Sequence, residues 1–152
     1  MNEKEQAKFE QFRDIVNNLI LREEQKISQL LSVKDLFSDN NLTNHITKRS
    51  NFVSQSKEFL EKTVNSDKYA NNLNFVTKYQ NEFFLNIDAL RKEALQLISF
   101  KSKPWYEKLF KSNFEAIKIL NRNLIIGDYP NDVSTMERTI QEIELLRHKS
   151  GY

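Results

Sequence analysis

The chain has 152 residues, of which 39% are hydrophobic and 29% are charged, and its net charge is +2. This length and apolar content support a hydrophobic core, so the charged residues indicate a solvated exterior, and the net charge is too small to imply a polyanionic partner. The absence of cysteine excludes disulfides, thiolate nucleophiles and Cys-ligated metals. With only two glycines and two prolines, little interrupts a helix, and we expect one all-α domain over residues 1–152.

The first predicted helix runs from about Glu3 to Leu36. Glu23 and Glu24 interrupt its apolar stripe, and we interpret them as the edge of the stripe, with a local bend as the alternative. The segment Ser38–Asn41 then predicts a turn, because its side chains compete for backbone hydrogen bonds. The stripe recurs near the helical period at Phe9, Phe12, Val16, Leu19, Ile20, Ile27, Leu30 and Leu31.

The second predicted helix runs roughly from Thr43 to Val64. Its apolar positions are sparser and the face between them is rich in Ser and Lys. We therefore expect it at the edge of the bundle.

The third predicted helix covers about 30 residues from Tyr69 to Leu97, with apolar residues at alternating four- and three-residue steps. A second stripe of Phe84, Leu95 and Ile98 widens its apolar arc, which predicts that it is the central helix of the bundle, contacted by more than one neighbour. Gln80 is the polar residue in this seam, and we expect it at a solvent-accessible edge. Its alternative role is to fix the register of packing.

Pro104 begins the fourth predicted helix, which runs to Ile126 and ends at Gly127. A loop of turn-forming residues follows. The sequence Ser134–Glu137 matches a capping box and predicts a short fifth helix from Thr135 to about His148. Short connections favour an antiparallel up-and-down bundle of four main helices plus this fifth one, and the long helices suggest an elongated bundle or a coiled-coil dimer.

The sequence contains no complete catalytic or metal-binding motif. His45 has no acid or second histidine at helical spacing and is predicted to lie at the surface or its boundary. Glu144 and His148 could share a helix face, but one such pair is an incomplete metal site, and an exposed helix end is the simpler interpretation. There is no glycine-rich phosphate loop. We therefore predict a protein that is not an enzyme and binds no cofactor or metal.

The segment Lys101–Arg122 holds six basic residues against two acidic ones, a net charge of +4. On a helical wheel its basic residues gather opposite an apolar side, which makes 104–126 a basic amphipathic helix. Three interpretations stay open: a solvated face of a bundle helix, a contact for an acidic protein partner, and a contact for anionic lipid or nucleic-acid backbone. The candidate binding residues are Trp105, Lys108, Lys111, Lys118 and Arg122.

By elimination, the favoured function is a non-enzymatic protein-interaction module, such as an adaptor, accessory subunit, inhibitor or immunity-type protein, that presents a helical surface. The alternative is an anionic membrane-surface or nucleic-acid-backbone binder that uses helix 104–126. The expected partners are another protein, acidic if the basic stripe is the contact, or a second copy of the chain in a homodimer. The charged N-terminus and the lack of a long apolar stretch predict a cytoplasmic location.

Overall fold

The computed structural model describes residues 3–37, 39–101, 114–126 and 129–149, and these residues form helices and no strand. The prediction of an all-α bundle is therefore confirmed. The elements in chain order are α1 (Glu3–Val33), the 3-10 helix η1 (Lys34–Leu36), α2 (Asn40–Asn65), α3 (Asp67–Ala70), α4 (Leu73–Lys101), α6 (Phe114–Leu124) and α7 (Tyr129–Lys149).

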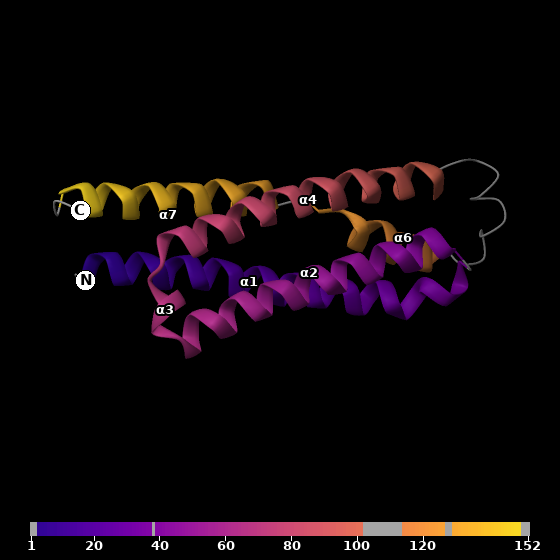
Figure 1. The fold of residues 1–152 in the computed structure, drawn as a ribbon. Helices are drawn as coiled ribbons and strands as arrows, with labels where there is room; N and C mark the ends of the chain where they lie inside the picture. The colour runs from indigo at the N-terminus through magenta and orange to yellow at the C-terminus, as the bar shows by residue number, and fades with distance from the viewer. Residues whose placement is uncertain (1–2, 38, 102–113, 127–128, 150–152) are drawn as a thin grey trace.

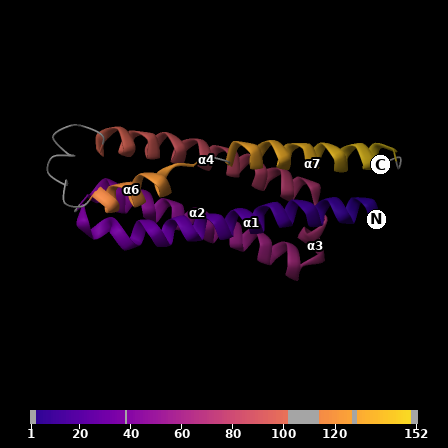
Figure 2. The same ribbon diagram turned by 180° about the vertical axis from the view of Figure 1, so that it is seen from behind.

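The helices form an elongated bundle of four rods whose directions alternate (Figures 1 and 2). The first three rods are α1, α2 and α4. The fourth rod consists of α6 and α7, which follow one another along the length of the molecule (Figure 1). Both α1 and α4 pack against α2 on one side and against α6 and α7 on the other. The fifth predicted helix, α7, has 21 residues against 11 in α6, so it is the longer described part of the fourth rod and not a short addition to the bundle.

The prediction that α4 has more than one neighbour is confirmed, since it packs against α2, α6 and α7, but its central position is wrong because α1 has the same neighbours. Two residues of its second apolar stripe stay at the surface, Phe84 at 50% and Leu95 at 56% exposure, whereas Ile98 is partly buried against the core. Only the stripe that includes Leu90 is buried, so α4 contributes one face to the core, as α1 does. The predicted solvent-accessible position of Gln80 is also wrong. Its side chain is buried and donates a 3.4 Å hydrogen bond to Glu137 across the interface with α7.

The turn between α1 and α2 follows the sequence closely. The Asp39 side chain accepts hydrogen bonds from the backbone N–H groups of Asn41 and Leu42, at 2.9 and 3.3 Å. This N-cap satisfies donors that the first turn of a helix leaves without partners, so α2 begins at Asn40, three residues before the predicted start.

The predicted third helix is divided. The chain leaves the helical path after Ala70 and α4 begins at Leu73, where the Asn72 side chain accepts a hydrogen bond from the N–H of Phe75, at 3.1 Å. Arg13 of α1 donates to the carbonyl of Ala70 at 2.8 Å, and Arg147 of α7 donates to the carbonyl of Asn71 at 3.0 Å. Tertiary contacts therefore stabilise a break that the apolar spacing alone did not indicate.

The last helix begins six residues earlier than predicted, at Tyr129. Ser134 and Glu137 lie inside α7, so the predicted capping box is wrong. The Tyr129 hydroxyl is anchored to a carboxylate of α1, which fixes the start of the helix from a distant part of the chain.

The predicted edge position of α2 is also wrong, because α2 packs against both α1 and α4. Its polar residues Arg49 and Ser56 are completely buried, and each has a hydrogen-bond partner on another helix. Aromatic rings fill the core at the end of the bundle near α3. Phe59 of α2 stacks on Tyr79 of α4 with ring centres 4.1 Å apart, and Phe12 of α1 meets Phe59 edge to face at 5.9 Å.

Candidate functional site

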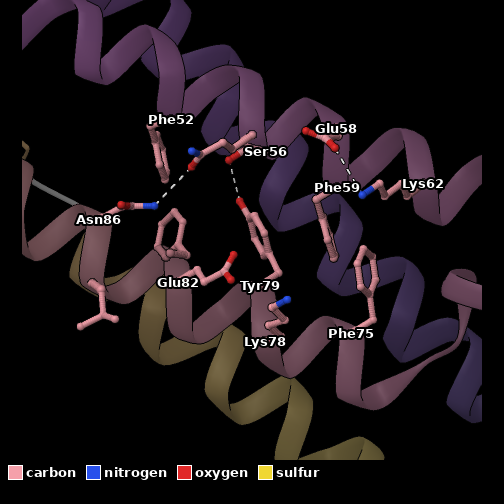
Figure 3. A pocket seen from close by; sticks show the side chains of 13 residues that line it. Phe52, Ser56, Glu58, Phe59, Lys62, Phe75, Lys78, Tyr79, Glu82 and Asn86 are labelled. Atoms are coloured by element: carbon pink, nitrogen blue, oxygen red, sulfur yellow. Dashed lines mark hydrogen bonds and ion pairs between the residues drawn. The ribbon is translucent and has the colours of Figure 1, made fainter.

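An open groove of about 520 Å³ lies between α2 and α4 (Figure 3). Its floor is made of aromatic rings from both helices, which pack against one another. Tyr79 also shares a 2.7 Å hydrogen bond with the hydroxyl of Ser56, and burial raises its pKa, so the phenol stays protonated at neutral pH. The rings of the floor belong to Phe52, Phe59, Phe75, Tyr79 and Phe83.

The rims of this groove carry charges of both signs. Glu58 and Lys62 line the α2 side and form an ion pair at 3.3 Å, while Lys78 and Glu82 line the α4 side (Figure 3). Leu85, also on the α4 side, is 67% exposed. The groove therefore has an exposed apolar side chain beside charges of both signs.

Polar side chains close the space between α2 and α4 farther along the same helices. The Glu93 carboxylate of α4 bonds the Nδ1 atom of His45 at 2.9 Å and the ammonium of Lys48 at 2.6 Å. Burial by itself raises the pKa of Glu93, but the hydrogen bonds from Lys48 and His45 outweigh it and lower that pKa overall. Glu93 is therefore ionised and bridges the two helices.

The predicted surface position of His45 is wrong, because its side chain is completely buried. Burial lowers the pKa of His45 below its ordinary value of 6.5, and the hydrogen bond to Glu93 opposes this only in part. The imidazole is neutral at pH 7 and donates from Nδ1 to the carboxylate. Its partner lies 48 residues away in the sequence, which explains why no local spacing revealed it.

A buried ionic cluster lies beside this bridge, where α6 ends and α7 begins. Arg49 of α2 donates hydrogen bonds to both carboxylate oxygens of Glu23 of α1, and the Tyr129 hydroxyl donates to the same carboxylate. Arg49 also donates to the carbonyl oxygens of Asn123 and Leu124 in the last turn of α6, at 2.9 and 3.4 Å. Glu23 is 1% exposed, so its predicted position at the edge of the stripe is wrong.

This cluster ties three rods together through one guanidinium. Burial raises the pKa of the Tyr129 phenol, and the adjacent Glu23 carboxylate raises it further. The phenol therefore remains a hydrogen-bond donor. Neither Arg49 nor Tyr129 was predicted from the sequence. The available signal was a glutamate within an apolar stripe, because a buried glutamate requires a cationic partner.

The basic stripe predicted on helix 104–126 is described only in part. Trp105, Lys108 and Lys111 lie outside the described residues. The ammonium of Lys118 lies 3.8 Å from the carboxylate of its neighbour Glu115, and its side chain is 58% exposed. In the described part of the predicted helix, Leu120 and Leu124 are completely buried, as their spacing predicts.

Arg122, the remaining member of the stripe, lines a hollow of about 650 Å³ between α1 and the junction of α6 and α7. Arg22 and Lys26 of α1 line the same hollow. Arg22 pairs with Asp132 at 2.7 Å, and Lys26 donates to the carbonyl of Ile125 at 2.9 Å. The hollow therefore gathers three basic residues from two parts of the chain, an arrangement that the sequence did not indicate.

Within the described ranges, no group of three or more His, Asp or Glu side chains could hold a metal ion. Glu144 and His148 are both exposed near the end of α7. None of the helices described is both long and apolar enough to cross a membrane. Comparison of the chain with family models, with curated proteins and with solved structures gives no match.

Proposed function

We propose that this protein is a non-enzymatic interaction module, acting as an adaptor, accessory subunit, inhibitor or immunity-type protein, and that the α2–α4 groove receives a helical segment of another protein. The open groove with charged rims and an exposed leucine at its mouth is the observation that carries this proposal. Grooves between helices commonly bind amphipathic helices through a few apolar anchors.

A rigid floor favours binding because little conformational freedom is lost when a partner docks. The stacked rings of Phe59, Tyr79 and Phe75 and the hydrogen bond between Tyr79 and Ser56 hold the floor in place. Phe59 and Tyr79 are only 4% and 8% exposed, whereas Phe75 is half-buried. The accessible apolar contacts therefore lie toward the two ends of the groove, at half-buried Phe75 and at Leu85.

The rims define the chemistry of the partner segment. Phe75 and Leu85 are ten residues apart, which is about 15 Å along α4 and equals roughly three turns of a docked helix. The rim charges of Glu58, Lys62, Lys78 and Glu82 sum to zero. We therefore expect an amphipathic partner helix with apolar residues spaced over three turns and with charges of both signs, whereas a purely acidic partner fits the basic stripe better than it fits this groove.

Site-specific photocrosslinking tests the proposal. A benzoylphenylalanine placed at Leu85 is expected to form one defined adduct with a partner protein in extracts of the native host, identified by mass spectrometry. The matched control is the same substitution at Leu145 of α7, which is 55% exposed and distant in sequence from the groove. The adduct at position 85 should be lost when Lys78→Glu and Glu82→Lys are introduced together. Equal adducts at both positions, or an adduct indifferent to the charge exchange, would contradict the proposal.

A second candidate function is binding of an anionic membrane surface or a nucleic-acid backbone, and the convergence of Lys26 and Arg122 with Arg22, which Asp132 partly neutralises, favours it. Three basic side chains bind a polyanion weakly and in a salt-dependent manner. Arg122→Glu should then reduce binding to phosphatidylserine vesicles or to duplex DNA, while the control Lys149→Glu should not. Unchanged binding in both variants, or no binding by the parent protein at low salt, would eliminate this hollow as the contact.

A further inference from the structure

The outward face of α4 carries a short stripe of four residues, Phe84, Asp88, Arg91 and Leu95. Their spacing of four, three and four residues places them on one side of the helix over about 16 Å. Phe84 is 50% exposed and Leu95 is 56% exposed, although phenylalanine and leucine at this spacing are typical of a helix–helix seam. The stripe is separate from the groove described above, which α4 lines with other residues.

None of the described helices covers this stripe. The buried face of α4, which meets α2, α6 and α7, includes Phe83, Ile87 and Leu90. Asp88 forms an exposed ion pair with Lys92 on its own helix, at 2.9 Å, and Arg91 has no hydrogen bond or ion pair with the described residues. The central charges of the stripe are therefore available to a second molecule.

The order of the four residues is self-complementary. Read from one end the stripe is apolar, acidic, basic, apolar, and read from the other end it is apolar, basic, acidic, apolar. If two copies of α4 lie antiparallel about a two-fold axis between Asp88 and Arg91, each Asp88 faces Arg91 of the other copy. The same axis places Phe84 of each copy against Leu95 of the other copy.

We infer that a second copy of this chain packs on this face and forms an antiparallel α4–α4 homodimer. A two-fold interface uses the same patch on both subunits, so its charges must complement themselves, and these four residues meet that requirement. A partner of another kind would not require this symmetry. The inference goes beyond the proposed function, because it assigns a different face of α4 and a different partner.

Charge exchange at the centre of the stripe tests the inference by sedimentation velocity over a concentration series. In a dimer of Asp88→Arg, an arginine faces an arginine at both symmetric positions. In a dimer of Arg91→Asp, an aspartate faces an aspartate at both positions. Each single variant should raise the dimer dissociation constant by about ten-fold or more, because an attraction becomes a repulsion at two symmetric positions. The double variant Asp88→Arg with Arg91→Asp restores the complementarity and should dimerise within about three-fold of the parent, given the small energies of exposed pairs.

A mixture of the two single variants gives the most specific readout. One variant carries arginine at both positions and the other carries aspartate at both, so they should form a heterodimer although neither forms a homodimer. The control exchange is Glu24→Lys with Lys57→Glu, an exposed pair between α1 and α2 outside the groove, which should leave dimerisation unchanged. Circular dichroism melts confirm that each variant is folded. A parent protein that stays monomeric up to millimolar concentration, or single variants that dimerise like the parent, would overturn the inference.

Discussion

Arg49 and Glu23 form a completely buried ion pair between α2 and α1, 26 residues apart in the chain. The guanidinium also bonds two carbonyls at the end of α6, and the carboxylate also accepts from the first residue of α7. A single pair of side chains therefore fixes the position at which the fourth rod changes from one helix to the next. Buried charges of this kind are retained only when their hydrogen-bonding groups have partners.

Replacing Arg49 by methionine should lower the free energy of unfolding by roughly 3–5 kcal/mol, because it leaves the Glu23 carboxylate buried without its cation. Urea denaturation monitored by circular dichroism measures the change. The double variant Glu23→Leu with Arg49→Met should recover at least half of the loss, since a buried ion pair is often replaced by apolar residues at little cost. A single variant as stable as the parent protein would show that the pair does not hold the junction.

Removing the Tyr129 hydroxyl should destabilise the protein more than removing the Tyr79 hydroxyl. Tyr129→Phe deletes a bond to a buried carboxylate, worth about 1.5–3 kcal/mol, whereas Tyr79→Phe deletes a bond between two neutral hydroxyls, worth about 0.5–1.5 kcal/mol. Both substitutions conserve the ring, so each serves as the control for the other. The reverse order in urea denaturation would contradict the assignment of Glu23 as the ionised acceptor.

The stability of the protein should fall as the pH is lowered through the ordinary pKa of histidine. Because burial lowers the pKa of His45 from 6.5, the unfolded state binds a proton more readily than the folded state in the interval between the two pKa values. The free energy of unfolding therefore rises with pH in that interval, by at most about 1.4 kcal/mol per pH unit. The charged groups around the imidazole are Glu93, Arg49 and Glu23.

Urea denaturation at a series of pH values, compared between the parent protein and His45→Asn, separates this contribution from others. Asparagine retains a hydrogen-bond donor for Glu93 and cannot titrate. The free energy of unfolding of this variant should therefore depend less on pH just below pH 6.5. The lowered pKa of Glu93 makes a separate contribution to the free energy of unfolding. This contribution is present above pH 4.5, the ordinary pKa of the group, and is lost as the pH falls through the lower pKa of the folded state. An identical slope in both proteins near pH 6 would refute the role of His45.

Aspartate substitutions at two leucines of α4 should have very different effects on the free energy of unfolding. Leu90 is 6% exposed, and an unpaired carboxylate there should cost more than about 3 kcal/mol or prevent folding. Leu85 is 67% exposed, and Leu85→Asp should change the free energy of unfolding by less than about 1 kcal/mol. Thermal melts of the two variants provide the comparison. A native-like melt for Leu90→Asp would show that the buried face of α4 has been misassigned.

The sequence predicted the helices well where local chemistry decides them. The apolar stripe of α1 is buried as predicted except at Leu31, which is 47% exposed, and the predicted turn before α2 contains Asp39, which caps that helix. The break between α3 and α4 and the early start of α7 depend instead on Arg13, Arg147 and Glu23, which come from distant segments. Such contacts leave no periodic signal in the sequence.

The candidate site was less predictable than the fold for the same reason. His45 had no visible partner because Glu93 is 48 residues away, and Glu23 resembled a surface residue because its cation lies on another helix. The exposed positions of Phe84 and Leu95 were missed because helical spacing identifies an apolar face without stating what covers it. The groove between α2 and α4 depends on how side chains from two separate helices pack, which no local residue pattern specifies.

The fourth rod also has a consequence for synthesis on the ribosome. Glu23 precedes Tyr129 by 106 residues, so at 5–20 residues per second about 5 to 20 seconds separate their emergence. Arg49 follows Glu23 by only 26 residues and reaches it much sooner. We therefore expect that Glu23 can pair with Arg49 in a nascent α1–α2 hairpin before Tyr129 has been synthesised.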